Sequence, residues 1–238
     1  MSDRTILIVN DDGICSPGIV QLARAAVRFG EVWVVAPETQ RSAMSHRITC
    51  FDPITVRDHE FACDGVRAFS CSGSPADCVR VGIKVIGRKP DAVLSGINNG
   101  YNIGADIQYS ATVGAALEAA FWGIHAIAFS QDDPARHEVT DRYLDGLIEE
   151  YLDRPLSRSQ IWNINFPSCT VGECAGVKRG CTVSTDDYYA DDYSESVADD
   201  GSREYRLIMG RKPVFTEGCD LHAVCNNFVS VGIVNNLG

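Results

Sequence analysis

The chain has 238 residues, of which 45% are hydrophobic and 22% are charged, a composition that is ordinary for a folded globular protein and excludes wholesale disorder. Its formal net charge of −11 argues against a nucleic-acid polymer as partner, because such binding needs a basic face. No run approaches the roughly 18 consecutive apolar residues of a membrane span, and no signal peptide is recognisable, so the sequence predicts a cytoplasmic protein.

The chain opens with a strand and a helix. Residues 5–9 are a continuous apolar run of strand length. Ser16-Pro17 is typical of an N-cap and a first helical turn, apolar residues then recur at helical spacing, and Gly30 is expected to end the helix. A second strand is predicted over 32–36.

Strand and helix signals continue to alternate as far as residue 166. A third strand is expected over 66–71, and Ser74 with Asp77 three positions later forms a capping box that opens a helix to about Ile86. The remaining predictions are strands at 92–94, 124–129 and 161–166, a glycine- and asparagine-rich loop at 95–109, and helices from about Thr112 and over 143–152.

This alternation predicts an α/β fold, a Rossmann-like doubly wound parallel sheet. From about Cys169 the pattern changes to acidic turns and short alternating runs, among them 205–209 and 228–234. We therefore expect a core over residues 1–168 and, in the same domain, a hairpin-rich extension over 169–238 that serves oligomerisation.

Polar residues follow the predicted strands on the edge of the sheet where ligands bind in such folds. Asp11 and Asp12 follow the first strand, Ser42 the second and Asn98 the fourth. Two adjacent carboxylates repel each other, and a hard divalent cation such as Mg²⁺ or Mn²⁺ turns that repulsion into attraction. The alternative is an acid pair that caps a turn at Gly13; the other oxygens on the same edge favour a metal site.

Phosphate-binding features lie beside this pair. Gly96, Gly100 and Gly104 allow backbone N–H groups to approach an anion. Ser110 and Thr112 stand at a helix N-terminus, where free N–H groups and the helix dipole favour phosphate, although each residue taken singly is better explained as an N-cap.

Other catalytic motifs are missing from the sequence. It contains neither a dinucleotide fingerprint, nor a P-loop, nor a Gly-x-Ser-x-Gly elbow. Of the five histidines, His46 alone is expected near the crevice, as an acid or a substrate contact.

Several ordered motifs resemble the survival protein SurE family. They are ILIVNDDG at 6–13, Arg41-Ser42, GSPADC at 73–78, SGIN at 95–98 with GYNIG at 100–104, YSATVGAALE at 109–118, and NINFP at 163–167 with the stretch around 220–231. The resemblance extends over nearly the whole chain.

The resemblance implies a metal-dependent nucleotidase that removes phosphate from nucleoside 5′- or 3′-monophosphates and assembles as a homodimer or homotetramer. One divalent ion, Mg²⁺ or Mn²⁺, is expected on Asp11, Asp12, Ser42 and Asn98, with the two aspartates also catalytic. The predicted phosphate or substrate contacts are Asn99, Asn102, Ser110, Thr112 and His46. The sequence leaves open whether water or an aspartate attacks phosphorus.

The sequence departs from the family pattern at a few positions near the expected site. Ala111 replaces the usual glycine between Ser110 and Thr112, Ser74 stands where threonine is commoner, and residues 43–45 replace a more glycine-rich run. These changes leave the expected ligands intact.

Two alternative functions also fit an acidic pair after the first strand in part. A receiver-like Mg²⁺-binding signalling module also has an acidic pair after its first strand, but it needs a phospho-accepting aspartate after the third, where this chain has Ser72-Gly73-Ser74. An aspartyl-phosphate phosphatase of the haloacid-dehalogenase type usually carries Asp-x-Asp, which residues 10–13 do not match.

Overall fold

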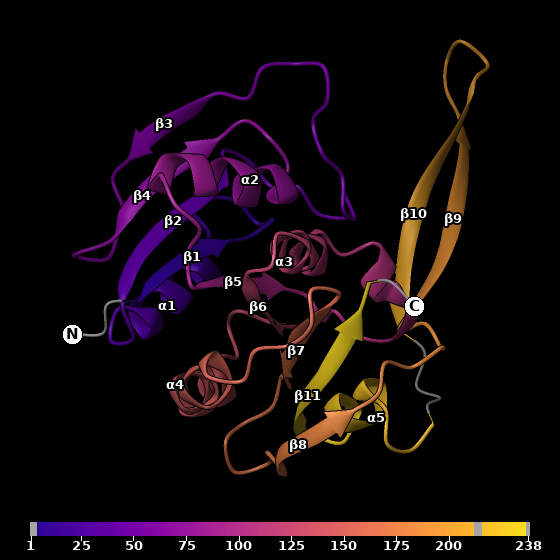
Figure 1. Cartoon of the computed structure of the whole chain (residues 1–238). Helices are drawn as coiled ribbons and strands as arrows, with labels where there is room; N and C mark the ends of the chain where they lie inside the picture. The colour runs from indigo at the N-terminus through magenta and orange to yellow at the C-terminus, as the bar shows by residue number, and fades with distance from the viewer. Residues whose placement is uncertain (1–3, 212–215, 237–238) are drawn as a thin grey trace.

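The structure, a computed structural model, describes residues 4–211 and 216–236. Within these residues nine strands form one sheet, and helices lie against both of its faces (Figure 1). In spatial order the strands are β3 (Val56–His59), β4 (Arg67–Cys71), β2 (Glu31–Pro37), β1 (Thr5–Val9), β5 (Ala92–Asn99), β6 (His125–Gln131), β7 (Gln160–Phe166), β11 (Phe228–Asn235) and β8 (Gly176–Cys181).

The sheet is mostly parallel. All neighbours from β4 through β2, β1, β5 and β6 to β7 pair in parallel, while β3 and β11 pair antiparallel with β4 and β7. The predicted α/β fold class is therefore confirmed. The carboxyl ends of β1, β2 and β5, three adjacent strands, meet at one edge.

Two apolar cores lie on the two faces of the sheet. The helices α1 (Pro17–Ala26) and α4 (Glu138–Leu152) pack on one face, and α2 (Pro75–Ile86) and α3 (Ala111–Phe121) on the other. Strand β1 contributes alternate residues to both: Ile6 and Ile8 to one, Leu7 and Val9 to the other. Because each is fully buried, each side chain contributes about 1.5–3 kcal/mol of burial free energy.

Local signals explain how the helices begin. Ser74 accepts a hydrogen bond from the Asp77 N–H and Asp77 accepts one from the Ser74 N–H, so the predicted capping box is present. Gly87 ends α2 with a φ of 80°, a left-handed conformation that favours glycine. Ser110 caps α3 by accepting from the Val113 N–H at 3.0 Å.

Several predicted boundaries are wrong. Helix α1 ends at Ala26 rather than at Gly30, where a Cβ would stand 2.3 Å from the Arg4 carbonyl oxygen, so Gly30 serves a close backbone approach. Helix α4 begins at Glu138, ahead of the predicted 143. Residues 95–99, predicted as loop, continue strand β5 because β6 pairs with them.

The C-terminal residues both extend the sheet and leave it. Strands β11 and β8 form its far edge, with the short helix α5 (Asp220–Cys225) beside them. Strands β9 (Tyr189–Val197) and β10 (Arg203–Arg211) form a separate two-stranded ribbon that stands away from the body (Figure 1). No helix in the described part of the chain is long and apolar enough to cross a membrane.

Candidate active site

Three strand ends converge on the acidic pair. Asp11 and Asp12 lie just beyond β1. From the loop after β2, the Arg41 N–H donates to the Asp11 carbonyl oxygen at 2.6 Å. From the end of β5, the Asn99 N–H donates to Asp12 Oδ2 at 2.9 Å. The structure therefore places segments that are distant in the sequence around one carboxylate pair.

Asp11 is a buried carboxyl group with a dedicated hydrogen-bond donor. It is 3% exposed, and the Thr112 hydroxyl at the start of α3 donates to its Oδ1 at 2.5 Å. Burial raises the pKa of Asp11 to about 7; the Thr112 hydrogen bond opposes this shift, and the charge of Asp12 adds to it. A nearby cation would lower that pKa again, because it stabilises the ionised form.

Asp12 is the more exposed member of the pair. Burial raises its pKa, and hydrogen bonds from the Asn99 N–H and the Gln40 side chain counteract part of that rise. Asp12 also lines a small hollow of about 220 Å³ with Gln40 and Asn99.

Ser42 and Asn98 supply neutral oxygens near the pair. Ser42 is exposed and accepts a hydrogen bond from Gln40 Nε2 at 3.2 Å. Asn98 donates from Nδ2 to the Gly100 carbonyl oxygen at 2.8 Å, which leaves its Oδ1 as the atom that can serve as a ligand.

The chemistry of these groups fits a hard divalent cation. Among the described residues no group of three His, Cys, Asp or Glu side chains could hold a metal ion. The candidate set is instead two carboxylates with a hydroxyl and an amide oxygen, an all-oxygen set of the kind that Mg²⁺ and Mn²⁺ prefer over Zn²⁺.

The four predicted phosphate contacts near the acid pair have different surroundings. Ser110 caps α3, and Thr112 uses its hydroxyl on Asp11 rather than keeping it free. Asn99 is exposed and engages Asp12 through its backbone. Asn102 is buried, and its side-chain amide donates to Ser130 Oγ at 2.8 Å, so that amide is engaged within the protein interior.

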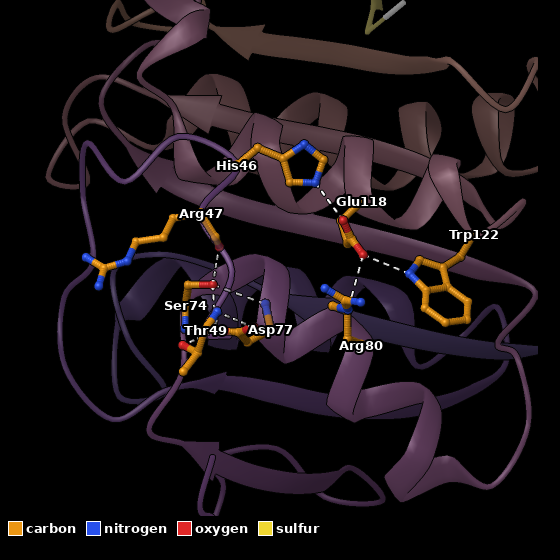
Figure 2. Close-up of polar contacts among 8 residues, drawn as sticks. All are labelled: His46, Arg47, Thr49, Ser74, Asp77, Arg80, Glu118 and Trp122. Carbon is orange, nitrogen blue, oxygen red and sulfur yellow. Dashed lines mark hydrogen bonds and ion pairs between the residues drawn. The ribbon is translucent and has the colours of Figure 1, made fainter. Parts of the chain in front are cut away.

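His46, the fifth predicted substrate contact, is held by a carboxylate that the sequence analysis missed. Glu118 Oε2 accepts from His46 Nε2 at 2.7 Å, and Glu118 Oε1 accepts from Trp122 Nε1 at 2.7 Å, with Arg80 Nε at 3.6 Å (Figure 2). Burial would raise the pKa of Glu118, but these hydrogen bonds and the nearby cations outweigh it and lower the pKa. Glu118 closes the family-like motif at 109–118, which was the available signal.

A second anchor fixes the other end of the same loop. The Thr49 hydroxyl donates to Asp77 Oδ2 at 2.7 Å, and its N–H donates to both carboxylate oxygens at 3.1 Å. Ser74 Oγ donates to the Arg47 carbonyl oxygen at 2.5 Å (Figure 2). The loop that carries Ser42 is therefore fastened to α3 through His46 and to the start of α2 through Thr49.

Between Ser42 and His46 the backbone takes an unusual conformation. Ala43 and Ser45 have φ angles of 56° and 51°, values that favour glycine over other residues. A Cβ on Gly114 of α3 would lie 2.5 Å from the Ser45 carbonyl oxygen. The loop thus lies directly against a glycine of α3. The positive φ angles of Ala43 and Ser45 explain why glycine would suit these positions of the loop.

Fold and site together define a doubly wound α/β protein with an acidic, oxygen-rich site at the carboxyl edge of its central strands. The family model described as survival protein SurE matches residues 6–190. The chain belongs to the SurE family.

Individual relatives agree with this assignment. The protein called 5′-nucleotidase SurE of Geobacter sulfurreducens is 40% identical over 232 residues, 95% of this chain and 86% of that protein. The 5′-nucleotidase SurE of Clostridium botulinum (strain Kyoto / Type A2) is 36% identical, with 95% and 90% covered. The crystal structure of the SurE protein from Aquifex aeolicus matches with a TM-score of 0.81 at 33% identity, over 98% of this chain and 94% of that one.

Proposed function

We propose that the protein is a metal-dependent phosphomonoesterase that hydrolyses nucleoside 5′- or 3′-monophosphates to nucleoside and phosphate. The main observation behind this proposal is the carboxylate pair at the end of β1. The Thr112 hydroxyl and the Asn99 N–H, from neighbouring segments, donate hydrogen bonds to Asp11 and Asp12. Relatives that share 36–40% identity with nearly the whole chain are called 5′-nucleotidases, and nothing in residues 4–211 and 216–236 favours a receiver or haloacid-dehalogenase-type alternative.

Asp11, Asp12, Ser42 and Asn98 would hold one Mg²⁺ or Mn²⁺ ion. When bound, that ion supplies positive charge for a phosphoryl oxygen and lowers the pKa of a water molecule. The chain's own groups do the positioning: Thr112 fixes the orientation of Asp11, and the Asn99 N–H fixes that of Asp12. Because Asp11 is buried and bonded to Thr112, we assign it to holding charge rather than to attacking phosphorus.

The N-terminus of α3 serves as the phosphate-binding end of the site. Ser110 caps the helix by accepting from the Val113 N–H, and Thr112 in its first turn contacts Asp11, so the positive end of the helix dipole lies next to the acid pair. This partial positive charge attracts the substrate's remaining phosphoryl oxygens. Positioning and charge neutralisation of this kind carry most of the acceleration in phosphoryl transfer.

We also propose that the protein works as a homodimer or homotetramer. The ribbon of β9 and β10 exposes Tyr193, Val197, Tyr205 and Leu207, and an isolated two-stranded ribbon gains stability by packing against another surface. The predicted cytoplasmic location and the division at residue 168 stay predictions.

The direct test measures phosphate release from nucleoside monophosphates with Mn²⁺, with Mg²⁺ and with EDTA. Chelation should abolish hydrolysis, and restoring the metal should recover it. Asp12→Asn keeps the shape of the side chain but removes one negative charge, so turnover at saturating Mn²⁺ should fall by roughly 10² to 10⁴-fold.

Asp58→Asn is the matched control, because Asp58 is an exposed carboxylate on the edge strand β3; it should keep wild-type turnover. Full activity in a demonstrably metal-free sample, or near-wild-type turnover of Asp12→Asn, would contradict the proposal.

A further inference from the structure

A hollow of about 290 Å³ borders the loop that carries Ser42. Its walls come from residues 41–49 and 52–54 and from the segment 72–74 between β4 and α2. It shares no lining residue with the hollow at Asp12, and neither Asp11 nor Asn98 lines it. The hollow is therefore not part of the candidate metal site.

The walls of this hollow carry an excess of positive charge. Arg41 and Arg47 both line it, and neither forms an ion pair with any residue that the structure describes. Asp52 is the only acid among the lining residues, and it is exposed. The chain as a whole has a net charge of −11, so carboxylates are abundant, yet these two guanidinium groups are left without one.

Arg41 has a donor that lacks an acceptor. Its Nε atom is buried and has no hydrogen-bond partner within residues 4–211 and 216–236. Its Nη2 atom makes only a long contact of 3.4 Å with the carbonyl oxygen of Ser72, another wall residue. A buried donor without an acceptor is costly, and a guanidinium group presents its donors in a planar fork that matches the oxygens of a phosphate.

Arg47 contributes the second guanidinium group. Arg47 is exposed, and its guanidinium lies apart from the carboxylates of Asp77 and Glu118 (Figure 2). Asp77 already accepts hydrogen bonds from Thr49 and Ser74. Arg47 therefore has its donors available for a group that enters the hollow.

The size of the hollow favours a small ion. Pockets that bury drug-sized ligands have volumes of roughly 300–1,000 Å³, so a hollow of about 290 Å³ suits a phosphate ion better than a whole nucleotide. Arginine pairs bind phosphate through short, charge-assisted hydrogen bonds. The charge, the donor without an acceptor and the volume agree on one class of ligand, a phosphate-like dianion.

We propose that this hollow binds inorganic phosphate between Arg41 and Arg47, and that phosphate bound there orders the loop that carries Ser42. Arg41 immediately precedes Ser42 and Arg47 closes the loop, so one anion bound to both joins its two ends. Two positions of the loop have positive φ angles, a conformation that such a bridge would stabilise. The site goes beyond the proposed nucleotidase function and does not rest on it, because binding requires no catalysis.

The test titrates phosphate into the metal-free protein by calorimetry, in EDTA and at constant ionic strength set by sodium chloride. Without a metal ion, the acid pair of Asp11 and Asp12 repels phosphate, so the titration reports on the hollow. The variants are Arg41→Gln and Arg47→Gln. Arg158→Gln is the control, because Arg158 also donates to a backbone carbonyl, that of Phe121, but does not line the hollow. Melting temperatures without phosphate verify that each variant folds.

Arg41→Gln and Arg47→Gln should each weaken phosphate binding by about tenfold or more, because each removes charge-assisted hydrogen bonds, whereas Arg158→Gln should stay within about twofold of the wild type. No binding to the wild type at up to about 10 mM phosphate, or unchanged affinity in either variant of the hollow, would overturn the site. Tighter binding of adenosine 5′-monophosphate than of phosphate, with the same losses in both variants, would overturn the assignment to free phosphate.

The effect on the loop is measured separately, by hydrogen exchange of residues 41–47 in the metal-free protein. Saturating phosphate should slow exchange in the wild type and leave it unchanged in Arg47→Gln. Unchanged exchange in the wild type with phosphate bound would overturn the ordering role. Failure of the protein to hydrolyse nucleoside monophosphates would refute the proposed function but not this site, since neither measurement here involves turnover.

Discussion

Burial of the Asp11 carboxyl group, with a smaller contribution from the charge of Asp12, makes its ionised form unfavourable in the folded protein. Its folded-state pKa of about 7 lies above the ordinary value of 3.8, so the folded chain binds a proton that the unfolded chain has already released. Stability of the metal-free protein therefore falls as pH rises from about 4 to about 7, and is level above that range.

The fall of stability with rising pH can be measured with a variant that lacks the Asp11 carboxyl group. Asp11→Asn removes the ionisation and should stabilise the metal-free protein more at pH 8 than at pH 5, by about 2–3 kcal/mol between the two. Urea unfolding in EDTA at both pH values measures it, with Asp58→Asn as an exposed control. An equal effect of Asp11→Asn at both pH values would show that burial of this charge is not costly.

Backbone strain in the ligand loop gives a second prediction. Ala43 is exposed and has a φ of 56°, so Ala43→Gly removes strain without losing packing, and it should raise stability by about 1 kcal/mol. Ala62→Gly is the control, because Ala62 is also exposed but does not have a positive φ angle. This substitution should lower stability slightly. Thermal unfolding of both variants checks the contrast; a lower melting temperature for Ala43→Gly would contradict it.

Single residues were predictable where a motif fixed their position in the chain. Asp11, Asp12, Ser42 and Asn98 follow strands that the sequence identifies, so their common edge could be foreseen. The partner of His46 could not, because Glu118 lies 72 positions away and only the packed fold brings the two together. Thr112 was expected to bind phosphate, but the structure shows that its hydroxyl serves Asp11.

At the level of elements, Asp77 links the start of α2 to the ligand loop. It is 1% exposed and accepts from both Ser74 and Thr49. Asp77→Asn exchanges an acceptor oxygen for a donor that faces other donors, so it should lower stability by about 1–3 kcal/mol.

Asp77→Asn should also weaken Mn²⁺ binding, measured by calorimetric titration, because the loop that carries Ser42 loses one of its anchors. Asp200→Asn is the matched control, because Asp200 also accepts hydrogen bonds from a serine N–H and hydroxyl but is exposed. This substitution should change stability little. If Asp77→Asn lowers the melting temperature yet binds Mn²⁺ as tightly as the wild type, the anchor at Thr49 does not support the ligand loop.

Helices and strands with strong local sequence signals were predicted well. Strands that depend on pairing with a neighbouring strand were not. The buried run of β1 and the capping box of α2 are encoded within a few residues. Strand β3 went unnoticed because its middle residues, Arg57 and Asp58, are exposed and it pairs only at the edge of the sheet. The end of β5 was predicted as loop from its glycine and asparagines, whereas pairing with β6 holds it extended.

At the level of the whole molecule, the ribbon of β9 and β10 exposes large apolar side chains on one face. Tyr193 pairs with Leu207 across the strands, and both are exposed, at 60% and 44%. We expect a dimer or larger assembly at micromolar concentration, and Leu207→Glu should shift the mass measured by light scattering toward the monomer. Val171→Glu is the control, since Val171 is also 44% exposed but lies outside the ribbon. A monomeric wild-type mass would contradict the assembly.

The placement of β1 at the middle of the sheet has a consequence for the protein while it is being synthesised. Asp11 and Asp12 leave the ribosome early, but β5, which covers the second edge of β1, and Thr112, which holds Asp11, follow much later. A chain that stops before them keeps an open strand edge, the kind of surface that invites aggregation. Such a truncated product carries the acidic pair without its supports, so premature termination yields an inert fragment rather than an unregulated phosphatase.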